Sequence, residues 1–157
     1  MKKWQWFLLS FLVVVTDQAT KYWALTNLTA YQPDPLFPMV NFTLAYNTGA
    51  AFSFLNGAGD WHRWFFAVFS IVMSIVLSVW LIRLPKAILP CLAVSLILGG
   101  ALGNLYDRAT LGHVIDFIDV YYQNHHWPVF NLADSAICLG AFFLLLNLVI
   151  EKKNEKG

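Results

Sequence analysis

Two aspartates lie in parts of the sequence where an ionised side chain is unexpected. Asp116 interrupts the apolar stretch Val114–Ile118, and Asp134 immediately precedes the long uncharged run 136–150. Two carboxylates at one site are the minimum set for acid–base hydrolysis of a peptide bond: one, ionised, takes a proton from water, and the other, protonated, hydrogen-bonds the carbonyl oxygen. Acids about 3 Å apart resist double ionisation, so such a pair shares one proton. Asp116 and Asp134 are therefore a candidate catalytic pair.

Each of these aspartates also has a plainer interpretation. Asp134 follows Asn131 by three residues, which is the spacing of an acid at N3 behind a helix N-cap. If the segment around Asp116 is a strand, Asp116 and Asp119 point to opposite faces, which predicts one in the site and the other in water. The two aspartates together indicate a catalytic site more strongly than either does alone. Both lie between the third and fourth apolar runs and therefore at the same end of those runs.

The parts of other catalytic sites are missing from the sequence. It contains no Gly-x-Ser-x-Gly, no His-Glu-x-x-His and no glycine-rich phosphate loop. His125 and His126 are adjacent, so they point apart in regular structure, and we expect them in a loop. Cys91 and Cys138 lie within apolar runs and are interpreted as small hydrophobic side chains.

Two further charged residues share one face of the first apolar run. Asp17 and Lys21 are four residues apart, with the acid N-terminal to the base, which is the favoured order on a helix. They form either a self-neutralising pair, with Lys21 reaching for the membrane interface, or a pair that faces the other helices and orients polar groups there. The two interpretations are compatible.

The third apolar run combines small and polar residues. Gly99 and Gly103 have the spacing that permits close helix approach. Asn104 follows, and Asp107 and Arg108 come at the end of the run. An acid near a helix C-terminus opposes the helix dipole, so we expect Asp107 to have a cationic or hydrogen-bonding partner. Arg108 is expected to anchor a lipid headgroup or a backbone carbonyl.

The composition indicates that lipid surrounds most of these elements. Of 157 residues, 59% are apolar and only 12% are charged, against roughly 25% charged in a soluble domain. The net charge of +1 is too small for a nucleic-acid binder, and so apolar a chain is not disordered. The length fits a single domain over residues 1–157.

Four runs approach the roughly 20 apolar residues that a membrane-spanning helix needs. The first, which follows Lys2 and Lys3, also resembles a signal peptide, but Asp17 and Gln18 interrupt it and no small-x-small cleavage site follows, so we predict a retained span. The predicted spans are Trp4–Leu25, Trp64–Leu84, Ala87–Tyr106 and Leu132–Ile150.

The distribution of cations predicts the orientation of these spans. Seven of the ten Lys and Arg residues flank the spans on one side, which is therefore expected to be cytoplasmic, with both termini there. The outer face then carries the segments Thr26–Arg63 and Asp107–Asn131. The cytoplasmic cations are Lys2, Lys3, Arg83, Lys86, Lys152, Lys153 and Lys156.

The first outer segment has the pattern of a small β element. Residues Asn41–Tyr46 partly alternate polar and apolar side chains, which predicts a short strand. Asn47–Gly49 and Asn56–Gly57 are turn signals, and His113–Tyr122 predicts another extended piece. The fold class predicted is a mainly α membrane protein with four transmembrane helices and a small β element with an extended loop on the outer face.

Five motifs, taken together, resemble the lipoprotein signal peptidase (signal peptidase II) family. They follow the family's order through nearly the whole chain, and the length and four-span layout agree. The motifs are Asp17-x-x-x-Lys21, Asn47-Thr48-Gly49-Ala50-Ala51-Phe52, the run Gly99–Arg108, Gly112-x-Val114-x-Asp116-Phe117, and Phe130-Asn131-x-Ala133-Asp134-Ser135.

The resemblance implies a substrate and a location. Family members are aspartic endopeptidases of the bacterial inner membrane with the active site near the outer, periplasmic interface. They remove the signal peptide from prolipoproteins whose cysteine already carries diacylglycerol, and they cut just before that cysteine. The resemblance further implies contact with membrane phospholipid, inhibition by the cyclic peptide antibiotic globomycin, no metal or cofactor and no nucleic-acid partner.

The resemblance also implies residue roles. Asp116 and Asp134 match the catalytic pair, and Asp17 and Lys21 match a motif that we interpret as structural support. The positions that line or support the site are matched by Asn47, Gly49, Asn104, Asp107, Arg108, Asn131 and Ala133.

Three other classes of function compete with this one. A small transporter could use paired Asp and Lys residues for proton relay, although its site is expected near the membrane midplane. A quinone-linked thiol oxidase would need pairs of cysteines on the outer face. A non-catalytic assembly factor would retain its function after Asp116→Asn or Asp134→Asn substitution.

Overall fold

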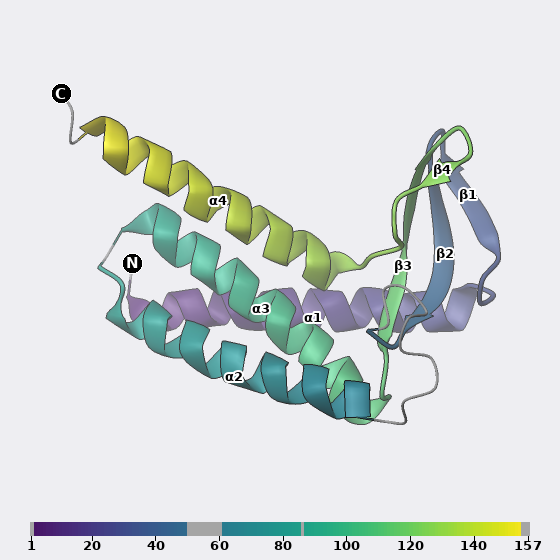
Figure 1. Ribbon diagram of the computed structural model, residues 1–157, viewed down its shortest axis with the longest axis horizontal. Helices are drawn as coiled ribbons and strands as arrows, with labels where there is room; N and C mark the ends of the chain where they lie inside the picture. The colour runs from purple at the N-terminus through teal and green to yellow at the C-terminus, as the bar shows by residue number, and fades with distance from the viewer. Residues whose placement is uncertain (1, 50–60, 86, 155–157) are drawn as a thin grey trace.

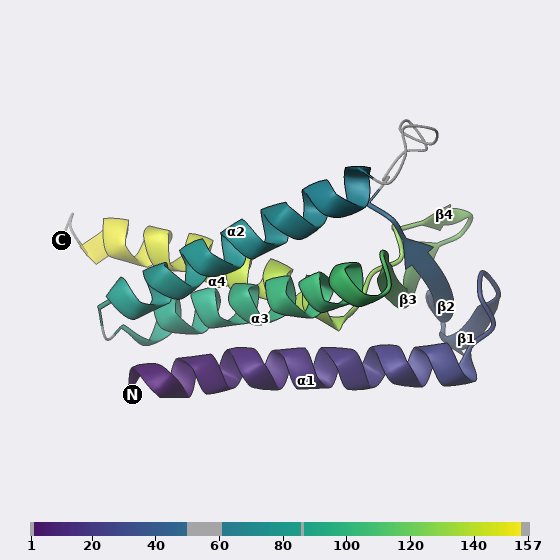
Figure 2. The same cartoon turned by 90° about the horizontal axis from the view of Figure 1, so that it is seen from below.

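The computed structural model describes residues 2–49, 61–85 and 87–154, which form a helical bundle with a small sheet at one end (Figures 1 and 2). The helices are α1 (Lys3–Asn27), α2 (Trp61–Arg83), α3 (Ile88–Thr110) and α4 (Leu132–Asn154). The strands are β1 (Pro33–Phe37), β2 (Val40–Asn47), β3 (Val114–Tyr122) and β4 (His125–His126). The predicted turn at Asn56–Gly57 and residues Ala50–Phe52 of the second motif lie outside the described residues.

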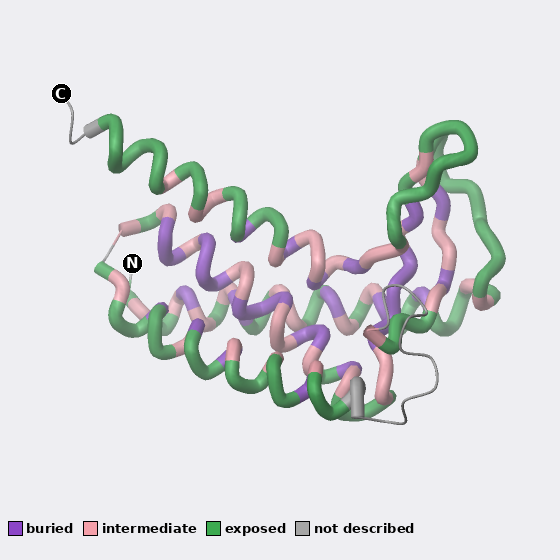
Figure 3. The backbone as a smooth tube through the Cα atoms, in the orientation of Figure 1, coloured by how far each residue is buried: buried purple, intermediate pink, exposed green. Residues whose placement is uncertain are grey.

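Helix α3 is the centre of the bundle and packs against each of the other three helices. In the most apolar part of α3, 61% of the residues are buried, against 22% in α2 and 17% in α4. Figure 3 shows that the buried positions are concentrated along α3. Contacts between α1 and α2 are few, and α2 and α4 lie on either side of α3 (Figure 1). The outer faces of α2 and α4 are correspondingly apolar and exposed, as expected where lipid is the solvent.

Small residues let the neighbouring helices approach α3 closely. A Cβ on Gly99 would lie 2.6 Å from Val13 Cβ of α1, and one on Gly103 would lie 2.6 Å from Asp17 Oδ2. A Cβ on Gly100 would collide with the carbonyl oxygen of Ala133 in α4. The predicted close approach at Gly99 and Gly103 is confirmed, and it brings both α1 and α4 against one stretch of α3.

Three described helices are long and apolar enough to cross a membrane: α2 from Trp64, α3, and α4 as far as Lys153. Helix α1 has 25 residues, but Asp17, Gln18 and Lys21 lower its mean hydropathy. Those polar groups are turned inward, since Asp17 and Lys21 are buried while Phe11 and Val15 are exposed.

The four strands form one antiparallel sheet in the order β1-β2-β3-β4. The predicted strands at Asn41–Tyr46 and His113–Tyr122 are confirmed as β2 and β3. Apolar residues of both strands pack on the end of α1, where the ring centroids of Trp23 and Phe42 are 5.0 Å apart. In the β2–β3 register Ala45 faces Asp116, so the sheet places Asp116 beside the end of the bundle.

Candidate active site

Asn131 joins the two predicted catalytic aspartates. Its side-chain amide donates to Asp116 Oδ1 at 2.7 Å, and its backbone N–H donates to Asp134 Oδ2 at 3.2 Å. Asp116 comes from β3 and Asp134 from the first turn of α4. The sequence prediction that both carboxylates meet at the same end of the bundle is therefore confirmed.

The helix-cap interpretation of Asp134 is also correct. Asp134 N–H donates to Asn131 Oδ1 at 2.9 Å while Asn131 N–H donates back to the carboxylate, which is the reciprocal pattern of a capping box. One oxygen of Asp134 is thus held by the helix start. Asn104 Nδ2 of α3 donates to the other oxygen, Oδ1, at 2.8 Å.

Asp116 is 2% exposed and is held by amide groups. Asn47 Nδ2 donates to its Oδ2 at 2.9 Å, opposite the bond from Asn131. Desolvation by burial, together with the nearby charge of Asp134, raises the pKa of Asp116 to about 7, and the hydrogen bonds from Asn47 and Asn131 oppose that rise. A carboxyl with this pKa carries a proton part of the time at neutral pH, as a shared-proton pair requires.

Lys21 determines which way the amide of Asn104 points. The Nζ of Lys21 donates to Asn104 Oδ1 at 2.9 Å, and Asn131 Nδ2 donates to the same oxygen at 3.1 Å. Because an ammonium group only donates hydrogen bonds, Asn104 must present its oxygen to Lys21 and its NH₂ to Asp134. Asn104 is therefore connected to both aspartates, directly to Asp134 and through Asn131 to Asp116.

Lys21 lies at the centre of a second acidic cluster, which we call the lysine cluster: Asp17, Lys21 and Asp107. Its Nζ is 2.8 Å from Asp17 Oδ2 and 2.9 Å from Asp107 Oδ2, and all three side chains are buried. The expectation that Asp107 has a cationic partner is confirmed, and Asp17 and Lys21 do face the other helices.

The lysine cluster also fixes the backbone that carries the candidate catalytic pair. Asp17 Oδ1 accepts the backbone N–H of Ala133 at 2.9 Å, and Asp107 Oδ2 accepts that of Ile115 at 3.1 Å. Ala133 and Ile115 are the neighbours of Asp134 and Asp116 in sequence. The cluster therefore ties α1 and α3 to the two segments from which the aspartates project.

Arg108 and Gly49 border the site from α3 and from the end of β2. Arg108 Nη1 is 3.5 Å from the carbonyl oxygen of Asn104, its guanidinium lies 5.7 Å from the ring centroid of Phe66, and its charge attracts Asp134 and Asp116. Gly49 has φ +86°, and a Cβ there would lie 2.5 Å from Phe66. Its N–H donates to Asn47 Oδ1 at 2.8 Å, which orients the amide that binds Asp116.

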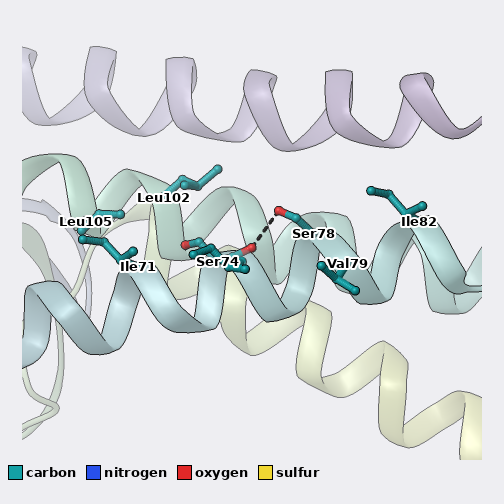
Figure 4. Close-up of a pocket in the computed structure, with 8 residues that line it drawn as sticks. Ile71, Ser74, Ser78, Val79, Ile82, Leu102 and Leu105 are labelled. Carbon is teal, nitrogen blue, oxygen red and sulfur yellow. Dashed lines mark hydrogen bonds between the residues drawn. The ribbon is translucent and has the colours of Figure 1, made fainter.

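Asp134 forms part of the wall of two pockets. The first, of about 240 Å³, lies between α2, α3 and α4, and Asn104 and Arg108 also line it. The second, of about 480 Å³, lies between the segment 127–130 and α4. A third pocket, of about 400 Å³, lies between α2 and α3 (Figure 4) and has no titratable side chain in its lining.

The prediction that one of Asp116 and Asp119 would be in water is wrong. Asp119 is 2% exposed and accepts hydrogen bonds from Asn41 Nδ2 at 3.3 Å and Thr43 Oγ1 at 3.0 Å. His126 Nδ1 lies 2.8 Å from its other oxygen. The face of β3 opposite the site is covered by polar partners, which the alternation of β3 alone does not reveal.

These contacts involve several residues that the sequence patterns did not indicate. Gln18 Nε2 donates to Asp107 Oδ1 at 2.8 Å, and its position one residue after Asp17 was the available signal. His126 was expected in a loop, but it belongs to β4. Burial raises the pKa of Asp119, but the hydrogen bonds from His126, Asn41 and Thr43 outweigh burial, so the pKa is lowered overall.

Cys91 and Cys138 are free thiols. Within the described residues, no group of three or more His, Cys, Asp or Glu side chains is placed to hold a metal ion.

Comparison with known proteins finds a family and close relatives. The family described as signal peptidase (SPase) II matches residues 9–150. A lipoprotein signal peptidase of Acinetobacter baumannii is 54% identical over 155 residues, covering 97% of this chain and 88% of the relative. One from Pseudomonas putida is 53% identical over 153 residues, covering 96% and 90%.

Solved structures show the same fold. A bacterial membrane enzyme determined by the in meso method superposes with a TM-score of 0.81 at 32% identity, covering 96% of this chain and 90% of that one. A second such structure gives a TM-score of 0.79 at 33% identity and covers 92% of each chain.

Proposed function

This chain belongs to the signal peptidase II family, and from that premise we propose that Asp116 and Asp134 are the catalytic pair of an aspartic peptidase that removes signal peptides from prolipoproteins. The observation that carries the assignment is the bridge made by Asn131, which donates to both carboxylates. The supporting residues have the arrangement that such a pair needs: Asn47, Asn104 and Asn131 present NH groups to the acids, and Asp17, Lys21, Asp107 and Ala133 hold the segments in place.

The reaction is a hydrolysis in which the pair moves one shared proton. The ionised carboxylate takes a proton from water, and the water oxygen forms a bond to the carbonyl carbon of the scissile amide. The protonated carboxyl hydrogen-bonds the carbonyl oxygen as negative charge develops there. A proton then passes to the amide nitrogen, the C–N bond breaks, and the pair is left with one proton again.

The membrane placement we propose is a multi-pass one with the site at the outer interface of the bacterial inner membrane. Helix α1 runs beside the three apolar helices and completes four spans. It begins, and α4 ends, at the end of the bundle opposite the sheet (Figure 1), where Lys2, Arg83 and Lys152 are also found. A cytoplasmic location of these cations places the sheet and both catalytic aspartates on the periplasmic side.

The substrate is proposed to enter sideways from the bilayer. The pocket between α2, α3 and α4 is lined in part by Asn104, Arg108 and Asp134. A signal helix lying against that pocket would reach Asp134 without leaving lipid. The cut then falls just before the diacylglyceryl cysteine, membrane phospholipid surrounds the exposed faces, and a cyclic peptide antibiotic such as globomycin would compete for the same pocket.

The test compares three aspartates of one chain in detergent. Asp116→Asn and Asp134→Asn should each lower turnover of a diacylglyceryl precursor, followed on a gel, by roughly a thousandfold. Asp119→Asn is the matched control, because Asp119 is equally buried on β3 but lies outside the site. Normal turnover by either of the first two variants, each purified as folded protein, would end the assignment.

A further inference from the structure

The carboxylate of Asp119, which lies outside the site, connects three strands of the sheet. Its Oδ2 accepts hydrogen bonds from Asn41 Nδ2 at 3.3 Å and Thr43 Oγ1 at 3.0 Å, both on β2. Its Oδ1 lies 2.8 Å from Nδ1 of His126 on β4. Because the pKa of Asp119 is lowered, the carboxylate is ionised at neutral pH and only accepts hydrogen bonds. Nδ1 of His126 therefore carries the hydrogen of this contact.

His126 lies at the start of the segment 127–130, which leads directly to the bridging residue Asn131. The segment begins beside β3, where the N–H of Trp127 donates to the carbonyl oxygen of Val120 at 2.8 Å. The hydrogen bond from His126 to Asp119 comes one residue earlier and joins the same two strands through side chains. The imidazole therefore helps to fix the end of the segment that lies farther from Asn131 along the chain.

The other end of the segment is joined to the strand that carries Asp116. The carbonyl oxygen of Phe130 accepts the N–H groups of Phe117 and Ile118, at 3.0 and 2.8 Å, and its N–H donates back to the carbonyl oxygen of Ile118 at 3.0 Å. The two donors follow Asp116 in the chain, and their acceptor precedes Asn131. The placement of the segment on β3 therefore sets the distance between Asn131 Nδ2 and Asp116 Oδ1, which is 2.7 Å.

We propose that His126 is a positioning residue for the catalytic pair: its hydrogen bond to Asp119 holds the segment 127–130 on β3 and thereby holds the amide of Asn131 on both carboxylates. The inference rests on the proposed function and adds to it a residue outside the site. The side chain of His126 is half exposed, so it can be replaced without opening the core. Asp119→Asn would still offer an oxygen to Nδ1, so substitution of His126 is the sharper change.

Two substitutions of His126 separate its hydrogen bond from its ring. His126→Phe keeps a ring to stack on Tyr121, whose centroid is 5.2 Å away, but it lacks the Nδ1 donor. We expect kcat for a diacylglyceryl precursor to fall by about five- to tenfold and KM to change by less than about twofold, because both acids remain while their shared donor loosens. His126→Asn places an amide N–H close to the position of Nδ1 and should restore most of the loss. His125→Phe, at the exposed neighbouring position of β4, is the matched control and should leave kcat unchanged.

The pH profile of kcat distinguishes positioning from a loss of folded enzyme. The hydrogen bond from Asn131 lowers the pKa of Asp116, whereas burial and the charge of Asp134 raise it. Loosening that bond in His126→Phe should therefore move the alkaline limb of the profile to higher pH, while a smaller folded fraction lowers kcat equally at every pH. The other charged groups that act on Asp116 are Lys21 of α1 and Arg108 of α3, and the substitution leaves both in place.

The asparagine variant identifies the cause of such a shift. Like phenylalanine, asparagine does not titrate, so an alkaline limb that moves in His126→Phe but not in His126→Asn reports the hydrogen bond. An unmoved limb in folded His126→Phe overturns the proposal, and so does an equal shift in the two variants. If His126→Phe does not fold, His126→Gln takes its place, because the longer side chain carries its amide past the position of Nδ1; a wild-type profile in that variant overturns the proposal.

Failure of this inference is distinguishable from failure of the function beneath it. A wild-type protein that cuts no diacylglyceryl precursor contradicts the proposed function itself. A wild-type protein that cuts the precursor, together with wild-type kinetics and pH profile in folded His126→Phe, contradicts only the role of His126.

Discussion

Two acidic clusters lie side by side in this bundle, and their carboxylates have different partners. In the lysine cluster, Asp17 and Asp107 both contact the ammonium group of Lys21, at 2.8 and 2.9 Å. Asp116 and Asp134, the proposed catalytic pair, accept side-chain hydrogen bonds from the neutral amides of Asn47, Asn104 and Asn131, and the charge of Arg108 lies nearby.

The difference separates a cluster that holds backbone segments in place from the pair that we propose to be reactive. Asp17 and Asp107 each contact a buried cation and also accept a backbone N–H group, from Ala133 and from Ile115 respectively, so their hydrogen-bonding capacity is used to hold other segments in place. Amide donors orient a carboxyl group without supplying a full positive charge, so the carboxyl can still bind a proton. The pKa of Asp116 rises to about 7 because burial penalises its negative charge. Asn104 touches both clusters and transmits the position of one to the other.

The largest effect on stability should come from removing the cation. Lys21→Met leaves two buried carboxylates unpaired, which is expected to lower the free energy of unfolding by about 3–5 kcal/mol, measured by denaturation in detergent. Lys153→Met is the control, since Lys153 is exposed at the end of α4 and should change stability by less than about 0.5 kcal/mol. Equal stabilities for the two variants would contradict a structural role of the lysine cluster.

The second prediction concerns the pH dependence that Asp116 gives to stability and turnover. The pKa of Asp116 is raised from 3.8 to about 7, so the stability linked to its bound proton is complete below about pH 4 and is lost as pH rises through 7. The loss is up to about 4 kcal/mol, and turnover should also decline above pH 7 as the shared proton leaves.

Asp116→Asn is the control for this measurement, because an amide does not titrate in that range. Unfolding of the variant should depend less on pH between 4 and 8 than that of the wild type. If the two pH profiles coincide, Asp116 is not the group that holds the proton.

A smaller effect is expected at the residue that connects the clusters. Asn104→Leu removes the donor to Asp134 Oδ1 and an acceptor of Lys21, and we expect kcat to fall by about ten- to a hundredfold, since the geometry of the pair loosens while both acids remain. Steady-state kinetics on the lipidated precursor measure this. Asn27→Leu, at an exposed position of α1, should leave kcat unchanged, and an equal fall in both variants would argue against the connection.

The smallest effect should come from the third buried acid. Asp119→Asn keeps most of the hydrogen-bonding geometry with Asn41 and Thr43 but loses the charge facing His126, so a cost of about 1 kcal/mol is expected, measured by denaturation. The pKa of Asp119 is lowered, so this contribution is present above its ordinary pKa and is lost as pH falls through its lowered value. A large loss of turnover would instead place Asp119 in the site.

Much of the site is predictable because local rules determine it. The alternation in Asn41–Tyr46 indicated β2, the spacing of Asn131 and Asp134 indicated a helix cap, and the spacing of Asp17 and Lys21 placed both on one helix face. Each of these patterns depends on residues within a few positions of one another. The same is true of the apolar runs from which the helices were predicted.

The sequence by itself determined which acids are available and on which segments they lie. The tertiary structure decided which charged groups and hydrogen-bond donors surround each of them. The same residue type occurs at Asp107, Asp116 and Asp119, and only the partners brought in by other elements distinguish them: Lys21 from α1, Asn131 from the start of α4 and His126 from β4. Charge neutralisation and desolvation act through space over a few ångströms, so no pattern along a single segment contains them.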